Sequence, residues 1–111
     1  MKSLTYPSEY LEFVRLFNAE KFFEAHEVLE VLWRRERGPV RDYYHGLIQI
    51  AAVFVHIQKG TPEGGKQLLS TAAGYFKSYS SVFMGIDPER LLEETRGSLF
   101  AGNPIPKIDL A

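Results

Sequence analysis

The residues that could do chemistry gather in two stretches of the chain, residues 22–33 and 46–56. The first reads F-F-E-A-H-E-V-L-E-V-L-W and the second reads G-L-I-Q-I-A-A-V-F-V-H. Together they hold His26 and His56, two of the three histidines, each among apolar residues. An ionisable side chain on an apolar surface needs a partner or changes its protonation. These stretches therefore mark either a structural polar network or a binding or catalytic site.

Helical spacing places the polar residues of both stretches beside apolar surfaces. His26 and Glu30 are four residues apart, so they are neighbours on a helix. They border an apolar arc made of Phe22, Ala25, Leu29, Leu32 and Trp33. His45, Gln49 and His56 form a narrow polar row on an otherwise apolar helix. If the two helices pack side by side, we expect His26, Glu30, Gln49 and His56 to converge.

Three interpretations of this cluster stay open. The first is a structural hydrogen-bond network that fixes the register of two helices. The second is a metal site built from His26, Glu27 or Glu30, and His56, because imidazole and carboxylate suit zinc, iron or manganese. The H-E-x-x-H and E-x-x-H patterns of known metal sites are missing, however. The third is a metal-free pocket in which a His–Glu pair binds a ligand or performs acid–base chemistry.

Other side chains extend the candidate site. Trp33 is expected in the core, with the wall of a pocket as the alternative, and Tyr44 is placed to reach the polar row with its hydroxyl. Four arginines lie at the corner between the two helices, namely Arg34, Arg35, Arg37 and Arg41. One interpretation is that these arginines offset the dipole of a helix C-terminus. The alternative is that they bind phosphate or carboxylate, and the candidates for such an anion site are Arg34, Arg37 and Arg41.

Proline and glycine punctuate a chain with helical apolar spacing, which predicts helices over about 7–18, 22–35, 40–59, 62–79 and 88–100. Thr61 and Asp87 are expected to cap the last two, each followed by a proline. The predicted fold is a single all-α domain over residues 1–111, a compact bundle of about five helices built from two antiparallel hairpins. Residues 102–111 should form an extended tail. The short turns and small residues after them resemble tetratricopeptide-type hairpins.

Composition narrows the classes of function. The 111 residues fit one domain, with 45% hydrophobic and 24% charged residues. The absence of cysteine excludes disulfides and thiolate chemistry and suits a reducing compartment. The chain shows neither a secretory signal nor an apolar run of membrane-spanning length, so we expect a cytoplasmic protein without membrane contact. A net charge of -1 argues against broad nucleic-acid binding.

Both stretches resemble a bacterial and archaeal family of small all-helical proteins catalogued as a domain of unknown function. The resemblance covers roughly residues 17–79. The residues that match the E-A-H-E-x-x-E-x-x-W hallmark and its continuation are Glu24, His26, Glu27, Glu30, Trp33, Gly46, Gln49 and His56. His45 stands where the family is expected to have glutamine. The resemblance implies a bundle with tetratricopeptide-like hairpins and no established activity.

The residues thus favour binding of a small ligand or partner in a groove between the helices at 22–35 and 40–59. One alternative is an enzyme, metal-dependent or using His/Glu acid–base chemistry, and of hydrolase type. Another is a tetratricopeptide-like module for protein interaction. A homo-oligomer stays open, and the sequence indicates no particular cofactor.

Overall fold

The computed structural model describes residues 6–79 and 81–111. The helices are α1 (Ser8–Asn18), α2 (Phe22–Arg35), α3 (Val40–Lys59), α4 (Glu63–Tyr75), the short 3₁₀ helix η1 (Phe76–Ser78) and α5 (Pro88–Ala101). Within these residues there is no strand, only an isolated bridge between Phe83 and Ile86. The all-α prediction is confirmed. None of the helices in the described ranges is long and apolar enough to cross a membrane.

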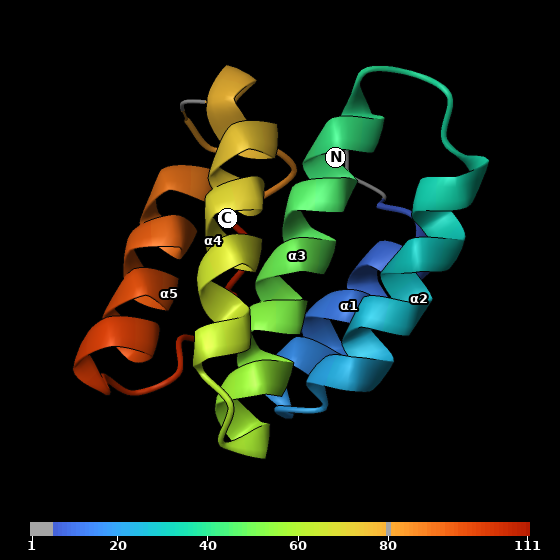
Figure 1. Cartoon of the computed structure of the whole chain (residues 1–111). Helices are drawn as coiled ribbons and strands as arrows, with labels where there is room; N and C mark the ends of the chain where they lie inside the picture. The colour runs from blue at the N-terminus through green and yellow to red at the C-terminus, as the bar shows by residue number, and fades with distance from the viewer. Residues whose placement is uncertain (1–5, 80) are drawn as a thin grey trace.

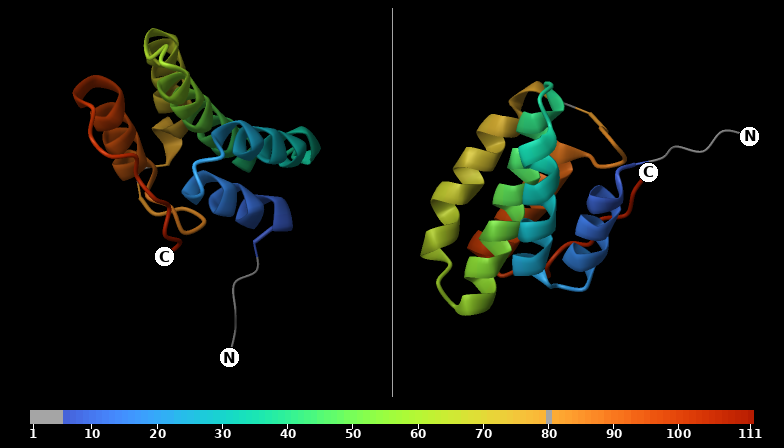
Figure 2. Two further views of the ribbon diagram at one scale, coloured as in Figure 1. Left: turned by 90° about the horizontal axis from the view of Figure 1, so that it is seen from below. Right: turned by 90° about the vertical axis from the view of Figure 1, so that its right-hand side faces the viewer.

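Helices α2, α3 and α4 lie side by side as one layer of the bundle (Figure 1). Helix α1 packs against α2 and α5 packs against α4, so that both lie toward the other side of the layer (Figure 2). Consecutive helices form the antiparallel pairs α1/α2 and α3/α4, as predicted. The outer face of the α2–α3–α4 layer is not covered by any other described element (Figure 1).

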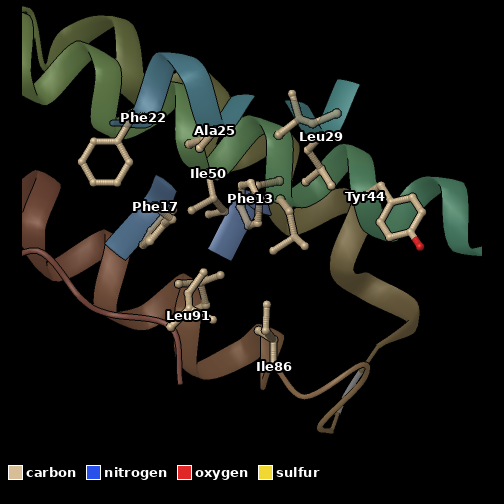
Figure 3. Close-up of a cluster of buried hydrophobic side chains, with 14 of the residues drawn as sticks. Phe13, Phe17, Phe22, Ala25, Leu29, Tyr44, Ile50, Ile86 and Leu91 are labelled. Carbon is tan, nitrogen blue, oxygen red and sulfur yellow. The ribbon is translucent and has the colours of Figure 1, made fainter. Parts of the chain in front are cut away.

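The core fills the space between this layer and the helices behind it. Figure 3 shows Phe17 and Phe22 beside Ile50, with Leu91 of α5 facing them. Phe17 packs edge-on against Phe22 and Phe54, with ring centroids 4.9 and 5.5 Å apart. Full burial of a side chain of this size stabilises a fold by about 1.5–3 kcal/mol relative to leaving it exposed. This contact joins α1, α2 and α3 in the core.

Two helix ends agree with the sequence, and two details of α4 differ. Gly60 ends α3 with a φ of 77°, and Asp87 caps α5 by accepting a hydrogen bond from the Arg90 amide at 3.2 Å. Helix α4, however, ends at Tyr75 rather than Tyr79, and η1 follows it. The buried Phe76 ring packs onto Gly46 of α3, which turns the chain out of the α-helical path. Pro62, not Thr61, is the N-cap of α4.

The tail is extended, as predicted, and is held by hydrogen bonds across the bundle. The Asn18 side-chain amide donates to the Ile108 carbonyl at 2.8 Å and accepts from the Ile108 amide at 2.7 Å. The Ile108 side chain is buried. The Ala111 amide also donates to the Gly85 carbonyl at 2.9 Å. The tail therefore closes the side of the bundle opposite the outer face (Figure 2).

Candidate functional site

The outer face of the layer carries most of the polar residues that the sequence singles out. We call the part between the first two of its helices the α2–α3 face. It is defined by His26, Glu30 and Trp33 of α2 and by His45 and Gln49 of α3. These five residues are half-buried, as is His56 of α3. Half-burial leaves part of each of these side chains accessible to solvent.

His26 and Glu30 form the pair that helical spacing predicts. The Nε2 atom of His26 lies 3.6 Å from Oε2 of Glu30, and the two side chains are 26% and 30% exposed. The Nδ1 atom of His26 is buried and has no hydrogen-bond partner. Its ring also stacks on Phe23, with centroids 6.0 Å apart. The 3.6 Å contact is longer than a hydrogen bond, so within the described residues neither nitrogen of this imidazole is hydrogen-bonded.

His45 is at the centre of an aromatic cluster that links three helices. Its ring lies 4.8 Å from Trp33 of α2 and stacks at 4.2 Å on Tyr75 of α4, measured between centroids. Burial, and then the positive charge of Arg41, lower the pKa of His45 from its ordinary value, while Asp42 and Glu30 act in the opposite direction. Trp33 is therefore not a fully buried core residue but walls this cluster.

His56 does not join His26 and Glu30. Its Nδ1 atom lies 3.0 Å from the Thr61 hydroxyl, and its ring packs over Gly64 at the start of α4. The reason is that α3 turns this position of the polar row toward α4 rather than toward α2. The expectation that all these side chains converge is therefore wrong for His56. Gln49 stays half-buried between them, and its side chain makes no hydrogen bond within the described ranges.

Two further candidates lie elsewhere. Glu27 is exposed, one position outside the apolar arc. The Tyr44 ring is buried against Tyr10 and Tyr43 on the core side of α3, so its hydroxyl does not reach the polar row (Figure 3). Burial raises the Tyr44 pKa, with a further contribution from Glu36. Among the described residues, no three histidine or acidic side chains are grouped to hold a metal ion, which leaves the metal interpretation without support.

The corner arginines have different surroundings. Arg34 lies 3.5 Å from Glu30, and Arg35 lies 3.0 Å from Glu9 of α1. Arg41 places its guanidinium carbon 4.0 Å from the centre of the Trp33 ring. Its Nε donates to the Trp33 carbonyl at 3.3 Å. Arg37 is exposed in the connection between α2 and α3.

A hollow of about 420 Å³ opens where α2 begins and α3 ends. Its lining includes Phe22, Phe23, Val55 and Gln58, with charged residues at its rim. The Phe23 side chain is 57% exposed, although phenylalanine usually buries most of its surface. Sequence reasoning missed this hollow and also the role of Tyr75. The available signal was Phe23 itself, an aromatic residue that lies outside the apolar arc of its helix.

A family model described as a domain of unknown function (DUF309) matches residues 10–68, more than half of the chain. YpuF of Bacillus subtilis (strain 168), an uncharacterized protein, is 30% identical over 92 residues, which are 79% of this chain and 53% of YpuF. An uncharacterized protein of Aquifex aeolicus (strain VF5) is 29% identical over 92 residues, 79% of this chain and 28% of that protein.

The chain thus spans about half or less of these curated relatives. No solved structure matches it. The matched region runs from Tyr10 of α1 to Leu68 of α4 and therefore includes the whole α2–α3 face.

Proposed function

The chain belongs to the DUF309 family, and we propose that it is a binding protein that holds a small molecule or a segment of a partner on the α2–α3 face. The observation that carries this proposal is the His26 ring. Its Nδ1 is enclosed without a partner, while the ring stacks on the exposed Phe23, which lines the hollow. Buried polar groups in folded proteins are normally paired, and those that are not call for a functional reason.

The hollow supplies the apolar part of the binding surface. Phe23 and Val55 come from neighbouring helices, and a ring or branched aliphatic group placed there would remove the exposed part of Phe23 from water. Covering roughly 100 Å² of apolar surface contributes on the order of 2–3 kcal/mol to the binding free energy. The entropy that the two molecules lose on association is subtracted from this value. The ligand we propose is therefore amphipathic, with an apolar group in the hollow and a polar group toward His26 and Glu30.

The helical hairpins favour a partner segment as the occupant. The α1/α2 and α3/α4 pairs are antiparallel (Figure 1), and we propose that they act like tetratricopeptide-type hairpins, whose stacked helices form binding surfaces. We propose that this binding takes place in the cytoplasm, a reducing compartment with which a chain without cysteine is compatible.

An acid–base enzyme is the second candidate, favoured by the 3.6 Å contact between His26 and Glu30. It ranks below binding for a geometric reason. Nε2 faces Glu30 and Nδ1 is enclosed, so a substrate reaches a nitrogen of this ring only if the ring turns.

Capped amino acids test the binding proposal, because they mimic the side chains of a partner. We expect N-acetyl-tryptophanamide and N-acetyl-leucinamide to shift the backbone amide NMR signals of residues 22–26 and 55–59, and N-acetyl-lysinamide to shift them far less. Phe23→Ser should abolish the response. Phe100→Ser is the matched control, because Phe100 is 58% exposed on α5. Equal losses in both variants, or no shifts with the wild type, would reject the proposal.

A further inference from the structure

Two of the four corner arginines are not neutralised by a carboxylate. Arg34 and Arg35 pair with Glu30 and Glu9, respectively. In the described part of the chain, no carboxylate lies within ion-pair distance of Arg37 or Arg41. Arg37 and Arg41 therefore have no direct ion-pair partner within the described residues, at the end of α2 where the chain turns into α3.

Arg41 is held in place although it has no ionic partner. Its guanidinium lies over Trp33 at 4.0 Å, and its Nε donates to the Trp33 carbonyl. No described residue accepts a hydrogen bond from its two terminal nitrogens. The two terminal nitrogens of this guanidinium can therefore donate hydrogen bonds to two oxygens of one anion. Because the side chain is already held in place, it loses little rotamer entropy on binding.

His45 adds a further donor at the same place. It lies four residues after Arg41, so both side chains project from one side of α3, and both contact Trp33. Neither ring nitrogen of His45 is hydrogen-bonded within the described ranges, and neither is enclosed. The Arg41 guanidinium carbon lies 4.0 Å and the His45 ring centroid 4.8 Å from the centre of the Trp33 ring. The carboxylates of Asp42 and Glu30 also act on the pKa of His45.

We propose that Arg41 and His45, with Trp33 as the floor, form a binding site for a phosphate group, and that Arg37 adds long-range positive charge. A phosphate offers three or four oxygens around one centre, so a guanidinium fork and an imidazole can bind it together, whereas a carboxylate offers only two. This site is at the end of the α2–α3 face opposite the Phe23 hollow. The phosphate proposal can therefore be tested independently of the binding proposed at the hollow.

The single tryptophan of the chain makes the site directly observable. We expect inorganic pyrophosphate at low ionic strength to change Trp33 fluorescence saturably. Arg41→Gln should weaken binding at least tenfold, and Arg41→Lys should lie between, because lysine keeps the charge but loses the fork. Arg96→Gln is the control, since Arg96 lies on α5, paired with Glu93 at 2.7 Å, and its loss should leave binding unchanged. Circular dichroism checks that each variant is folded.

Two more measurements sharpen the assignment. Bound pyrophosphate stabilises the imidazolium of His45, so the NMR titration of its Cε1–H should move to higher pH, and this shift should be missing in Arg41→Gln. ADP binding more tightly than pyrophosphate would assign the phosphate to a nucleotide, and equal binding would assign it to a free phosphate. Citrate binding as tightly as pyrophosphate, an equal loss in Arg96→Gln, or no saturable signal in the folded wild type would each overturn the proposal.

Discussion

The Nε2 atom of His26 faces Oε2 of Glu30 at 3.6 Å, whereas Nδ1 of the same ring is enclosed without a partner. A network that serves only to fix the register of two helices would satisfy both nitrogens, because an unpaired buried polar atom destabilises the fold by about 1–3 kcal/mol. An unpaired buried nitrogen calls for a functional reason, and a ligand would reach this nitrogen only after the His26 ring turned. The relationship therefore supports a site rather than a scaffold.

The lowered pKa of His45 predicts how stability changes below neutral pH. The folded protein disfavours protonation of His45 because the ring is partly desolvated and lies near Arg41. Its contribution to stability is complete above the unfolded pKa, near 6.5, and is lost as pH falls toward the lower folded value. The unfolding free energy from urea titrations should therefore fall from pH 7.5 to 5.5 more steeply in the wild type than in His45→Gln. Parallel curves would contradict the assignment.

The hydroxyls of Tyr10 and Tyr43 predict an asymmetry between two similar mutations. They lie 2.8 Å apart, and they also contact the carbonyls of Met84 at 2.8 Å and Phe83 at 3.0 Å. The two hydroxyl groups have only two protons to donate, so at most two of these three contacts are hydrogen bonds. The Phe83 carbonyl also accepts from the Ile86 amide, whereas no other described donor reaches the Met84 carbonyl. We infer that Tyr43 donates to Tyr10, and that Tyr10 donates to Met84.

Tyr10→Phe should therefore destabilise the protein by about 1–3 kcal/mol, because it leaves the Met84 carbonyl unpaired. Tyr43→Phe removes only one hydrogen bond and should cost about 0.5–1.5 kcal/mol. Thermal or urea unfolding measures both values. The reverse order would show that the protons are arranged the other way.

Gly64 allows the ring of His56 to lie directly against α4. A Cβ atom at this position would meet the imidazole at 2.5 Å, so Gly64→Ala must displace the ring from Thr61. We expect the loss of the contact between His56 and Thr61 to offset part of the roughly 0.5–1 kcal/mol that alanine gains over glycine in a helix, so Gly64→Ala should stabilise less than Gly74→Ala. Gly74→Ala on the same helix meets nothing within 4 Å and should be neutral or stabilising. If Gly64→Ala stabilises as much as Gly74→Ala does, the contact with His56 is not formed.

Much of the fold could be predicted because local rules act on single residues. Gly60 ends a helix with its positive φ, and the Asp87–Pro88 pair begins one. The end of α4 could not be predicted, because it depends on contact between Phe76 and Gly46, which are thirty positions apart in the chain. Aromatic residues continue the helical pattern to Tyr79, but tertiary packing stops the helix earlier.

The candidate site was predictable within one helix and much less so between helices. The contact between His26 and Glu30 follows from their spacing. The direction of the His56 side chain does not follow from spacing. A rotation of about 100° around the helix axis, which is one residue, decides whether a side chain of α3 faces α2 or α4. His45 was the weakest candidate by sequence resemblance, yet it bridges Trp33 and Tyr75. Periodicity shows which residues share a stripe but does not identify the helix that packs against it.

The most direct test of the binding proposal is the variant His26→Leu, studied for stability and for binding of N-acetyl-tryptophanamide. If the ring serves a ligand, leucine fills the same half-buried volume without an unpaired nitrogen. The unfolding free energy should then stay within about 1 kcal/mol of the wild type or rise, while binding falls at least tenfold. A loss of several kcal/mol in stability with unchanged binding would instead show that His26 holds the helices together and that the α2–α3 face is not a binding site.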